Sequence, residues 1–288
     1  AGNGGRHAMP NLAADRRRLA PAAAIALTLA AAAAIFWPRP APPPPIETAN
    51  RTPLSVTEIH ADLDYSLHDV AQTKRVPRLF IENLKADLQR IPDVDEKKRT
   101  FFRIMLPIVA AENERIRAER ARIDGADDGA LADLYTKYGV DAGERQTLLR
   151  RVDIVPASLA LAQAAIESGW GTSRFARQGN NFFGMRTYSD AKPGIAPREA
   201  DGFKVSAYPN IARSVRAYMF NLNTHWAYAD FRAARARQRS AHGGVRGLDL
   251  VGFLGSYSEI PKKYANRLRS LIDADDLHRY EGVRLDER

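Results

Sequence analysis

The chain has 288 residues, no cysteine and a net charge of +9, and 45% of its residues are hydrophobic. The lack of cysteine excludes disulfides and thiolate chemistry but does not fix the compartment, and the length suits one large domain or two small ones. The basic balance favours an acidic polymer, an anionic membrane or nucleic acid as partner, unless the arginines only form a solvated surface.

The first predicted element is an uncharged run over residues 19–37, which directly follows a triple-arginine motif at residues 16–18. Its length is near the ~20 residues that a membrane-spanning helix needs. Basic residues before such a run predict that residues 1–18 are cytoplasmic and that the remainder of the chain is exported. We predict an uncleaved membrane anchor, but a cleaved signal peptide stays open, because the alanines at residues 30–34 offer small-residue cleavage sites.

Two further regions precede the most informative stretch of the chain. Residues 38–55 are rich in proline, which predicts a semi-rigid, extended spacer. Residues 56–150 show helical spacing of apolar residues and no strand pattern. Within them we expect a short amphipathic helix over residues 79–88 and a longer helix over residues 96–123, which Pro107 should kink or break.

The strongest chemical signal lies in residues 157–184. This stretch begins as an alanine-rich helix, which should be central because small residues allow close packing, and the helix ends in Glu167 before a Gly-Trp-Gly break. Partial burial, the negative end of the helix dipole and the adjacent Trp170 would each raise the pKa of this acid. A carboxylic acid that stays protonated near neutral pH can protonate a leaving oxygen, as glycoside cleavage requires. The alternative, a helix-terminal glutamate exposed to water, stays open at this point.

Aromatic and amide side chains that follow this acid suit a sugar ligand. The rings of Trp170, Phe182 and Phe183 could stack on pyranose faces, although loop aromatics can equally belong to the core. The amides of Asn180 and Asn181 could bind hydroxyl and acetamido groups. The stretch therefore indicates a glycan-binding cleft.

The motif Q-A-A-I-E-S-G-W-G-T-S, followed by N-N-F-F-G-M, resembles the glucosaminidase domains of glycoside hydrolase family 73. Three upstream stretches, V-P-R-L-F-I-E-N-L, D-V-D-E-K-K-R-T-F-F-R-I-M-L-P-I-V and A-E-N-E-R-I, resemble the Bax branch of that family, so the resemblance runs from about Val76 to the C-terminus. It implies a mainly α, lysozyme-like catalytic domain with a small β-hairpin at the cleft. It also implies hydrolysis of the β-1,4 bonds after N-acetylglucosamine in peptidoglycan, with Glu167 as general acid. Phe182 departs from the leucine that is usual before Phe-Gly.

The same resemblance implies a second acid. Residues 203–207 alternate apolar and polar side chains, which predicts a strand, and Asp201 and Gly202 before them suit a hairpin turn. In the family a small hairpin crosses the mouth of the cleft and often bears an acid, so Glu199 is the candidate for activating water or stabilising positive charge at the anomeric carbon. An exposed loop glutamate is the alternative, and the acetamido group of the substrate is an alternative nucleophile.

The C-terminal segment resembles the family's closing motif, an aromatic loop before the last helix. Its two tyrosines match Tyr257 and Tyr264, and we favour Tyr264 as the hydroxyl near the acid, because apolar residues fix it to a helix. The predicted catalytic residues are Glu167, Glu199 and Tyr264. The residues predicted to bind the glycan are Gln163, Trp170, Asn181, Phe183, Tyr208 and Tyr257.

Basic residues also gather after this cleft motif, as a stripe at Arg232, Arg235, Arg237 and Arg239. A solvated helix face is the first interpretation, and attraction to an acidic wall polymer is the second. Nucleic acid is not expected as a partner, because the exported chain would face outward.

The combined expectation is a mainly α protein whose partners are peptidoglycan glycan strands and the cytoplasmic membrane, the latter through residues 19–37. We expect it in the inner membrane, with a single span and the catalytic domain in the periplasm, and no metal or organic cofactor is implied. A lytic transglycosylase on the same fold and a non-catalytic wall-binding or scaffold protein remain alternatives. The predicted parts are a cytoplasmic N-terminus (1–18), a transmembrane or signal segment (19–37), a linker (38–55), a helical region (56–150) and a glucosaminidase domain (151–288).

Overall fold

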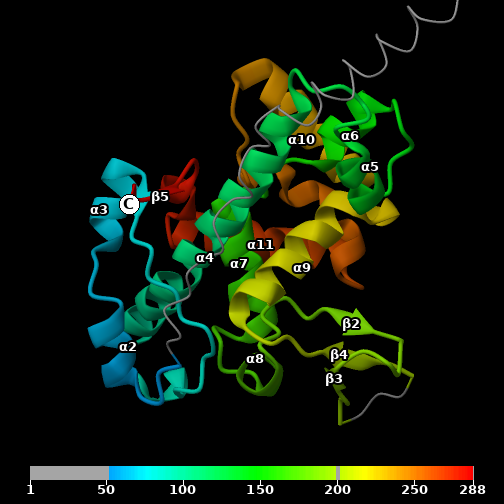
Figure 1. The fold of residues 1–288 in the computed structure, drawn as a ribbon. Helices are drawn as coiled ribbons and strands as arrows, with labels where there is room; N and C mark the ends of the chain where they lie inside the picture. Colours follow the sequence, from blue (N-terminus) through cyan, green and yellow to red (C-terminus); the bar gives the residue numbers. More distant parts are fainter. Residues whose placement is uncertain (1–51, 199–201, 288) are drawn as a thin grey trace, which may run out of the picture. The chain divides into compact units, whose positions relative to one another are not determined.

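Helices dominate the computed structural model, which describes residues 52–198 and 202–287 (Figure 1). All of these residues belong to one unit, Pro45–Arg288. The α-helices are α2 (Val56–Asp62), α3 (Leu67–Thr73), α4 (Val94–Ile123), α5 (Ala132–Tyr138), α6 (Arg145–Arg151), α7 (Ala157–Ser168), α8 (Arg174–Gly179), α9 (Ile211–Thr224), α10 (Ala229–His242) and α11 (Pro261–Ala274). The 3₁₀ helices are η1 (Leu88–Arg90), η2 (Trp226–Tyr228), η3 (Leu248–Phe253), η4 (Gly255–Tyr257) and η5 (Leu277–Tyr280). The strands are β1 (Arg75–Val76), β2 (Arg186–Thr187), β3 (Gly194–Ile195), β4 (Lys204–Ser206) and β5 (Arg284–Leu285). The predicted mainly α fold with a small sheet is confirmed.

Helix α4 runs without interruption over 30 residues and packs against α7, α9 and β5. The Asp93 carboxylate caps its first turn by accepting a hydrogen bond from the Glu96 backbone N–H at 2.6 Å. The helix predicted over residues 96–123 is confirmed, and because Pro107 lies inside it, the alternative of a break at this residue is wrong. Its neighbours Leu106 and Ile108 are almost fully buried, and this packing sustains the helix despite the hydrogen bond that proline cannot donate.

Helix α7 is buried on nearly all of its surface, as its alanine-rich sequence predicts. Leu159, Leu161 and the alanines between and after them are 0% exposed, and the helix packs against α4, α11 and η5. Figure 1 shows α7 lying among α4, α9 and α11. The position of Glu167 is therefore fixed by a helix that contacts several other elements at once.

The Gly-Trp-Gly break ends α7 in three successive left-handed residues, with φ values of 57° at Gly169, 59° at Trp170 and 77° at Gly171. A left-handed tryptophan costs about 1–2 kcal/mol, which only tight surroundings can offset. The Trp170 ring packs edge-on against Phe101 and Phe102 of α4, at centroid distances of 5.6 and 5.5 Å. This packing ties the end of α7 to α4.

The helix predicted over residues 79–88 is not formed. The segment is irregular until η1, yet Phe80, Ile81, Leu84 and Leu88 are buried. A methyl group added to Gly171 would lie within 3.5 Å of Leu84 and Leu88, so these leucines cover the turn that ends α7. These apolar side chains contact other elements and do not form one face of a helix. The helical spacing of the residues therefore predicted the wrong secondary structure for this segment.

The basic stripe on α10 is not a solvated face. Arg235 is 0% exposed and Arg232 is 5% exposed, whereas Arg237 lies on the surface. Arg232 donates to the backbone carbonyls of Leu222 and His225 at 3.0 and 2.8 Å, so this guanidinium holds α9 to η2 and α10. The prediction of a solvated face is therefore wrong for Arg232 and Arg235. Their charge did not reveal this, because arginine can be buried when carbonyls and carboxylates accept its hydrogen bonds.

The small sheet has the strand order β2-β4-β3 with antiparallel pairing. Val205 in the central strand lies opposite Arg186 in β2 and Ile195 in β3. The strand predicted over residues 203–207 therefore forms, and it gains a second partner strand beyond the predicted hairpin. The turn at Asp201 falls partly outside the described residues.

Within residues 52–198 and 202–287, no helix is both long and apolar enough to cross a membrane. The predicted anchor, residues 19–37, lies outside these ranges.

Candidate active site

Glu167 is the penultimate residue of α7 and is partly buried. Burial raises the pKa of this carboxyl group, while a hydrogen bond from Tyr264 and the positive charges of Arg267 and Arg186 act against the rise. The predicted direction of the pKa shift is confirmed, with burial as its main cause. Trp170 is directed at α4, where Lys98 lies 5.4 Å from its ring centre.

A chain of hydrogen bonds fixes the tyrosine beside this acid. The Gln163 amide nitrogen donates to the Tyr264 hydroxyl at 2.9 Å, and the Tyr218 hydroxyl donates to the Gln163 amide oxygen at 2.6 Å. Because the Tyr264 oxygen accepts from Gln163, its own proton is left to donate to Glu167, with which it forms a hydrogen bond. The buried Gln163 thus sets the direction in which Tyr264 donates.

Stacked aromatic rings support this tyrosine. Tyr257 in η4 stacks on Tyr264 with a centroid distance of 5.8 Å and an interplanar angle of 4°. Its hydroxyl donates to the Phe183 carbonyl at 2.7 Å, and the Phe183 ring stacks on Tyr218 at 3.9 Å. Phe183 is 1% exposed, so in this conformation it supports the site from the core side.

Tyr228 in η2 completes the aromatic surroundings. Burial raises its pKa to about 12, a hydrogen bond with Asn221 acts against the rise, and the nearby charge of Glu167 adds to it. Tyr218 and Tyr257 also sense the charge of Glu167, although burial is the main reason that the pKa of each phenol lies well above its usual value. One carboxyl group therefore lies among phenols from η2, η4, α9 and α11.

The loop after α8 closes against the acid. The Asn181 amide donates to the carbonyls of Met185 and Ser206 at 2.8 Å each, and its oxygen accepts from the backbone N–H groups of Phe183 and Met185. These bonds tie the loop to β4. Gly184 has a φ of 65°, and a methyl group added to it would lie 3.1 Å from Oε2 of Glu167. Glycine is needed here both for its backbone conformation and for the space that it leaves beside the acid.

The sequence analysis did not identify two arginines whose positive charges act on Glu167. Arg267 follows Tyr264 by three residues on α11, a spacing that places both on one helix face and could have revealed it. Arg186 lies in β2 and stacks over the Phe203 ring at 4.4 Å. Its approach to Glu167 depends on the course of the loop after α8, for which the sequence holds no local signal.

The remaining predicted residues lie elsewhere or outside the described chain. The Tyr208 hydroxyl forms a hydrogen bond with the Ser206 side chain, and its backbone carbonyl accepts from Asn180 at 3.0 Å, so Tyr208 fixes the link between β4 and α9. Glu199 lies outside the described residues. In the described ranges, no group of three or more His, Asp or Glu residues could hold a metal ion. Direct contact of Trp170, Tyr208 and Tyr257 with a glycan stays a prediction.

Residues 144–277 match the glucosaminidase family, described as mannosyl-glycoprotein endo-beta-N-acetylglucosaminidase. Protein Bax of Escherichia coli (strain K12) is 36% identical over 197 residues, which are 63% of this chain and 71% of Bax. The catalytic domain of the autolysin Auto from Listeria monocytogenes is 18% identical, with a TM-score of 0.36 over 75% of this chain and 98% of that domain. With a TM-score this low, the similarity to Auto supports no statement about the geometry of the site in this chain. On the similarity to Bax, the chain belongs to the Bax family and contains its glucosaminidase domain.

Proposed function

We propose that this protein is an endo-β-N-acetylglucosaminidase that hydrolyses the β-1,4 bond after N-acetylglucosamine in peptidoglycan, with Glu167 as general acid. The observation that supports it most is the raised pKa of a partly buried Glu167 that receives a hydrogen bond from Tyr264. The glucosaminidase family match covers this residue and supports a glycan substrate. An acid whose pKa is raised, with Gly184 leaving space beside it, is suited to delivering a proton to a glycosidic oxygen.

The proposed reaction begins when Glu167 gives its proton to the oxygen that leaves the anomeric carbon. The carboxylate that remains is stabilised by the Tyr264 hydroxyl and by the charges of Arg186 and Arg267. These groups favour the charged form of Glu167, so their effect is largest after proton transfer. Burial favours the protonated acid before the step, and the three polar neighbours lower the free energy of the state that follows.

A second group must activate water or attack the anomeric carbon, and the candidates are Glu199 and the acetamido group of the substrate. Glu199 lies in sequence between β3 and β4, and β2 of the same sheet bears Arg186, which acts on Glu167. Its place in the sequence, between two strands of the sheet that bears Arg186, supports Glu199 as the residue that activates water. The anomeric configuration of the fresh product, measured by NMR, separates the two: direct attack by water gives inversion, and attack by the acetamido group gives retention.

Product analysis tests the proposed reaction. Purified peptidoglycan is digested with the protein, and the new glycan ends are identified by mass spectrometry. Reducing N-acetylglucosamine ends are expected. Anhydro-muramyl ends would assign a lytic transglycosylase instead, and an undigested polymer with bound protein would assign a wall-binding role.

A location at the outer face of the cytoplasmic membrane fits this substrate. We propose that residues 19–37 anchor the chain there and that the catalytic domain acts in the periplasm. The uncharged run after three arginines supports this orientation.

A further inference from the structure

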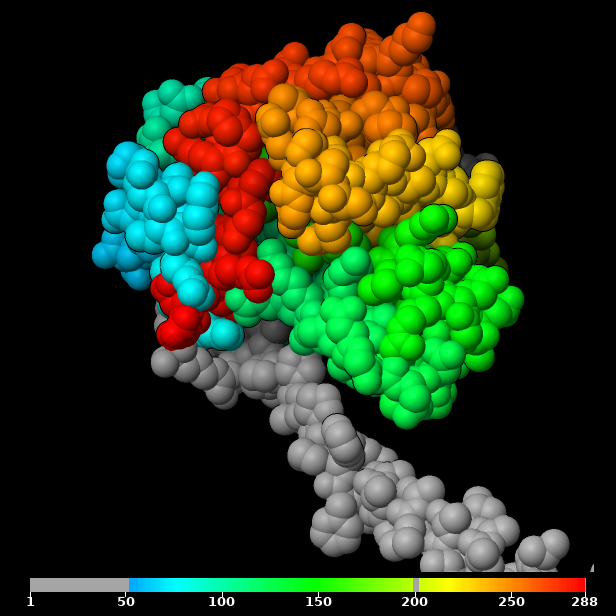
Figure 2. All heavy atoms as spheres, turned by 90° about the horizontal axis from the view of Figure 1, so that it is seen from above, coloured from blue at the N-terminus to red at the C-terminus, as the bar shows by residue number. Residues whose placement is uncertain are grey.

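A cavity of about 650 Å³ lies away from Glu167, which is not among the residues that line it. It is bounded by the C-terminal part of α4, the end of α10 and the segments 243–246 and 281–284. Figure 2 shows the C-terminal segment (red) beside α4 (teal) and the residues that follow α10 (orange) on one face. Ser158 binds Glu281 of this cavity and precedes Glu167 by nine residues on α7. At 1.5 Å per residue, the cavity and the acid are therefore about 14 Å apart along the helix.

The lining of this cavity is rich in arginine. Its basic residues outnumber its acids, so the balance of charge depends on which acids are already paired. The arginines are Arg117, Arg120, Arg239, Arg246 and Arg284, and the acids are Asp124, Asp153 and Glu281.

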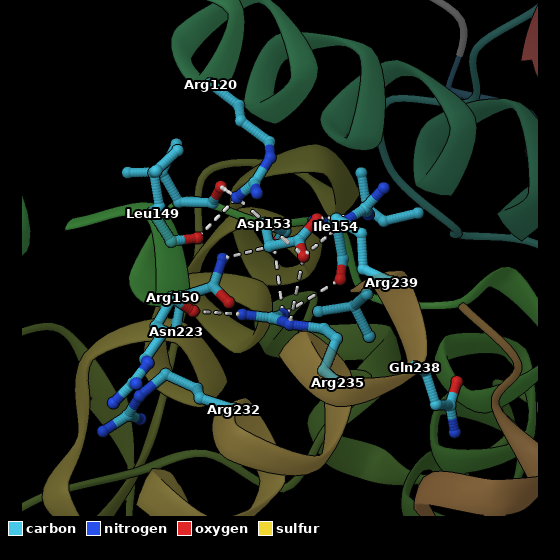
Figure 3. Close-up of polar contacts among 12 residues, drawn as sticks. Arg120, Leu149, Arg150, Asp153, Ile154, Asn223, Arg232, Arg235, Gln238 and Arg239 are labelled. Atoms are coloured by element: carbon cyan, nitrogen blue, oxygen red, sulfur yellow. Dashed lines mark hydrogen bonds and ion pairs between the residues drawn. The ribbon is translucent and has the colours of Figure 1, made fainter. Parts of the chain in front are cut away.

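Asp153 is already shared among several guanidinium groups, which converge on it in Figure 3. Arg239 donates to its carboxylate at 2.8 Å, and Arg120 and Arg235 lie 3.9 and 3.8 Å away. Asp153 is 2% exposed, and although burial acts against it, these arginines lower the pKa of its carboxyl group. This carboxylate therefore compensates the structural arginines and leaves little negative charge for the rest of the cavity.

Glu281 is also engaged. Its carboxylate accepts hydrogen bonds from the Ser158 hydroxyl at 2.5 Å and from the Gly247 N–H at 2.8 Å. Burial raises the pKa of this acid, which disfavours its charged form. Arg246 has its own surface partner, Asp249, at 3.8 Å.

Arg117 and Arg284 are left with the least compensation. The Nη1 atom of Arg117 is buried and has no hydrogen-bond partner among the described residues. Burial and the charges of Arg284 and Arg239 lower the pKa of Arg117 to about 10, although the charges of Glu114 and Asp153 act against this shift. An unsatisfied donor and neighbouring like charges both cost free energy, which a bound anion would recover.

Open space lies beside these arginines. The cavity is bordered by Gly243, Gly244 and Gly282, and a methyl group added to any of them would meet nothing within 4 Å. We propose that this cavity is a binding site for a phosphate group, held chiefly by Arg117 and Arg284. Phosphate carries a charge of about −1.5 to −2 near neutral pH and offers several oxygens to the forked donors of arginine. Its charge is large enough to pair with both guanidinium groups, whereas a carboxylate with a single charge would neutralise only one of them.

Calorimetric titration of the full chain with inorganic phosphate and with glycerol 1-phosphate, at low salt, tests the site. We expect one saturable site, with affinity lowered at least about tenfold in Arg117→Gln and in Arg284→Gln, since each loses a charge-assisted hydrogen bond. Arg237→Gln, on the exposed face of α10, is the matched control and should bind as the wild type does. Arg284 is exposed, so its substitution should not unfold the protein even if that of Arg117 does.

Absence of saturable binding, equal affinities in all four proteins, or acetate binding as tightly as phosphate would overturn the proposal. Vesicles then identify the source of the phosphate. Arg117-dependent sedimentation with phosphatidic acid vesicles, whose headgroup is a phosphate monoester, compared with phosphatidylcholine vesicles, would assign a lipid headgroup. Binding of glycerol 1-phosphate without that dependence would assign a soluble phosphate.

Discussion

The buried acids of this protein differ in what surrounds each of them. Glu112 is 0% exposed and forms ion pairs with Arg115 at 2.9 Å and Arg216 at 2.7 Å, so it joins α4 to α9 as a structural carboxylate. Glu167 forms no ion pair among the described residues and instead receives a phenol hydrogen bond, with arginines acting at a distance. An acid that is buried without a close cation is suited to hold and release a proton.

Arg186 should tune the pH at which the acid works. Its positive charge lowers the pKa of Glu167, so Arg186→Gln should raise that pKa further. Because the protonated acid is the active form, the alkaline limb of the kcat profile should move to higher pH. Profiles of the wild type and of Arg186→Gln on soluble glycan fragments measure this shift, with Arg237→Gln as the control. A limb that stays in place or moves to lower pH would contradict this arrangement.

Gly184 should matter for activity more than for stability. Gly184→Ala places a methyl group 3.1 Å from Glu167 and adds the strain of a left-handed alanine, about 1–2 kcal/mol. Gly125 has a φ of 81° and open space around it, so Gly125→Ala adds similar strain without touching the acid. We expect comparable losses of unfolding free energy in urea but a drop in kcat only for Gly184→Ala. Equal activities of the two variants would show that the loop does not confine the acid.

At the scale of the elements, the segment between α6 and α7 is fixed by Asp153 and the arginines around it. Beyond its ion pair with Asp153, Arg235 donates to the backbone carbonyls of Asp153, Ile154 and Arg150 at 2.9–3.1 Å. The Asn223 amide donates to the Asp153 carbonyl at 2.9 Å from α9. Helices α9 and α10 are thereby connected to the chain that leads into α7.

Asp153→Asn should destabilise the fold by about 3–5 kcal/mol, because it leaves the buried Arg235 without its countercharge. Urea unfolding at neutral pH measures the loss. Asp249→Asn, which removes an exposed partner of Arg246, should change the free energy of unfolding by about 0.5 kcal/mol or less.

The same carboxylate links stability to pH. Its arginine partners lower the pKa of Asp153 in the folded state despite burial, so its contribution is present above the ordinary aspartate pKa and is lost as pH falls through the lowered value. The difference between wild type and Asp153→Asn should therefore shrink in strong acid. A difference that is small already at neutral pH would contradict the structural role of Asp153.

Some elements could be predicted from the sequence, and others could not. The course of α7 follows from its alanine-rich sequence and glycine end, and the strand near Val205 follows from alternation. The helix over residues 96–123 also follows from its apolar spacing, but its continuity through Pro107 and the irregular course of residues 79–88 depend on contacts with distant elements. The link from Gln163 to Tyr264 spans 101 residues of sequence, and only the tertiary fold reveals it.

At the scale of the whole molecule, the roles of the charged residues could also be predicted only in part from the sequence. From the sequence alone, the net charge of +9 indicates either a solvated surface or attraction to an acidic polymer, an anionic membrane or nucleic acid. Instead, Arg232 and Arg235 are buried, and Arg117 and Arg284 line a cavity. A residue count cannot separate arginines that fix the fold from those that are free to bind a ligand, because the difference lies in their partners.

The proposed anchor predicts how the protein fractionates. When the protein is expressed with residues 1–37, it should sediment with membranes and keep the mass of the uncleaved chain if residues 19–37 span the bilayer as proposed. Removal of residues 1–37 should release it into the soluble fraction. A shorter mass with a new N-terminus near residues 30–34 would show instead that a signal peptide is cleaved.

The proposed reaction depends above all on Glu167 as the acid, and the rate of peptidoglycan digestion by Glu167→Gln is its sharpest test. Since burial raises the pKa of Glu167, the charged carboxylate is disfavoured in the fold, and the glutamine variant should be at least as stable as the wild type at neutral pH. Glu144→Gln, at an exposed acid, is the matched control. We predict that Glu167→Gln lowers the rate of release of reducing N-acetylglucosamine ends by about 10²–10⁴-fold while Glu144→Gln leaves it unchanged. A folded Glu167→Gln protein that digests peptidoglycan within a few-fold of the wild-type rate would contradict the account.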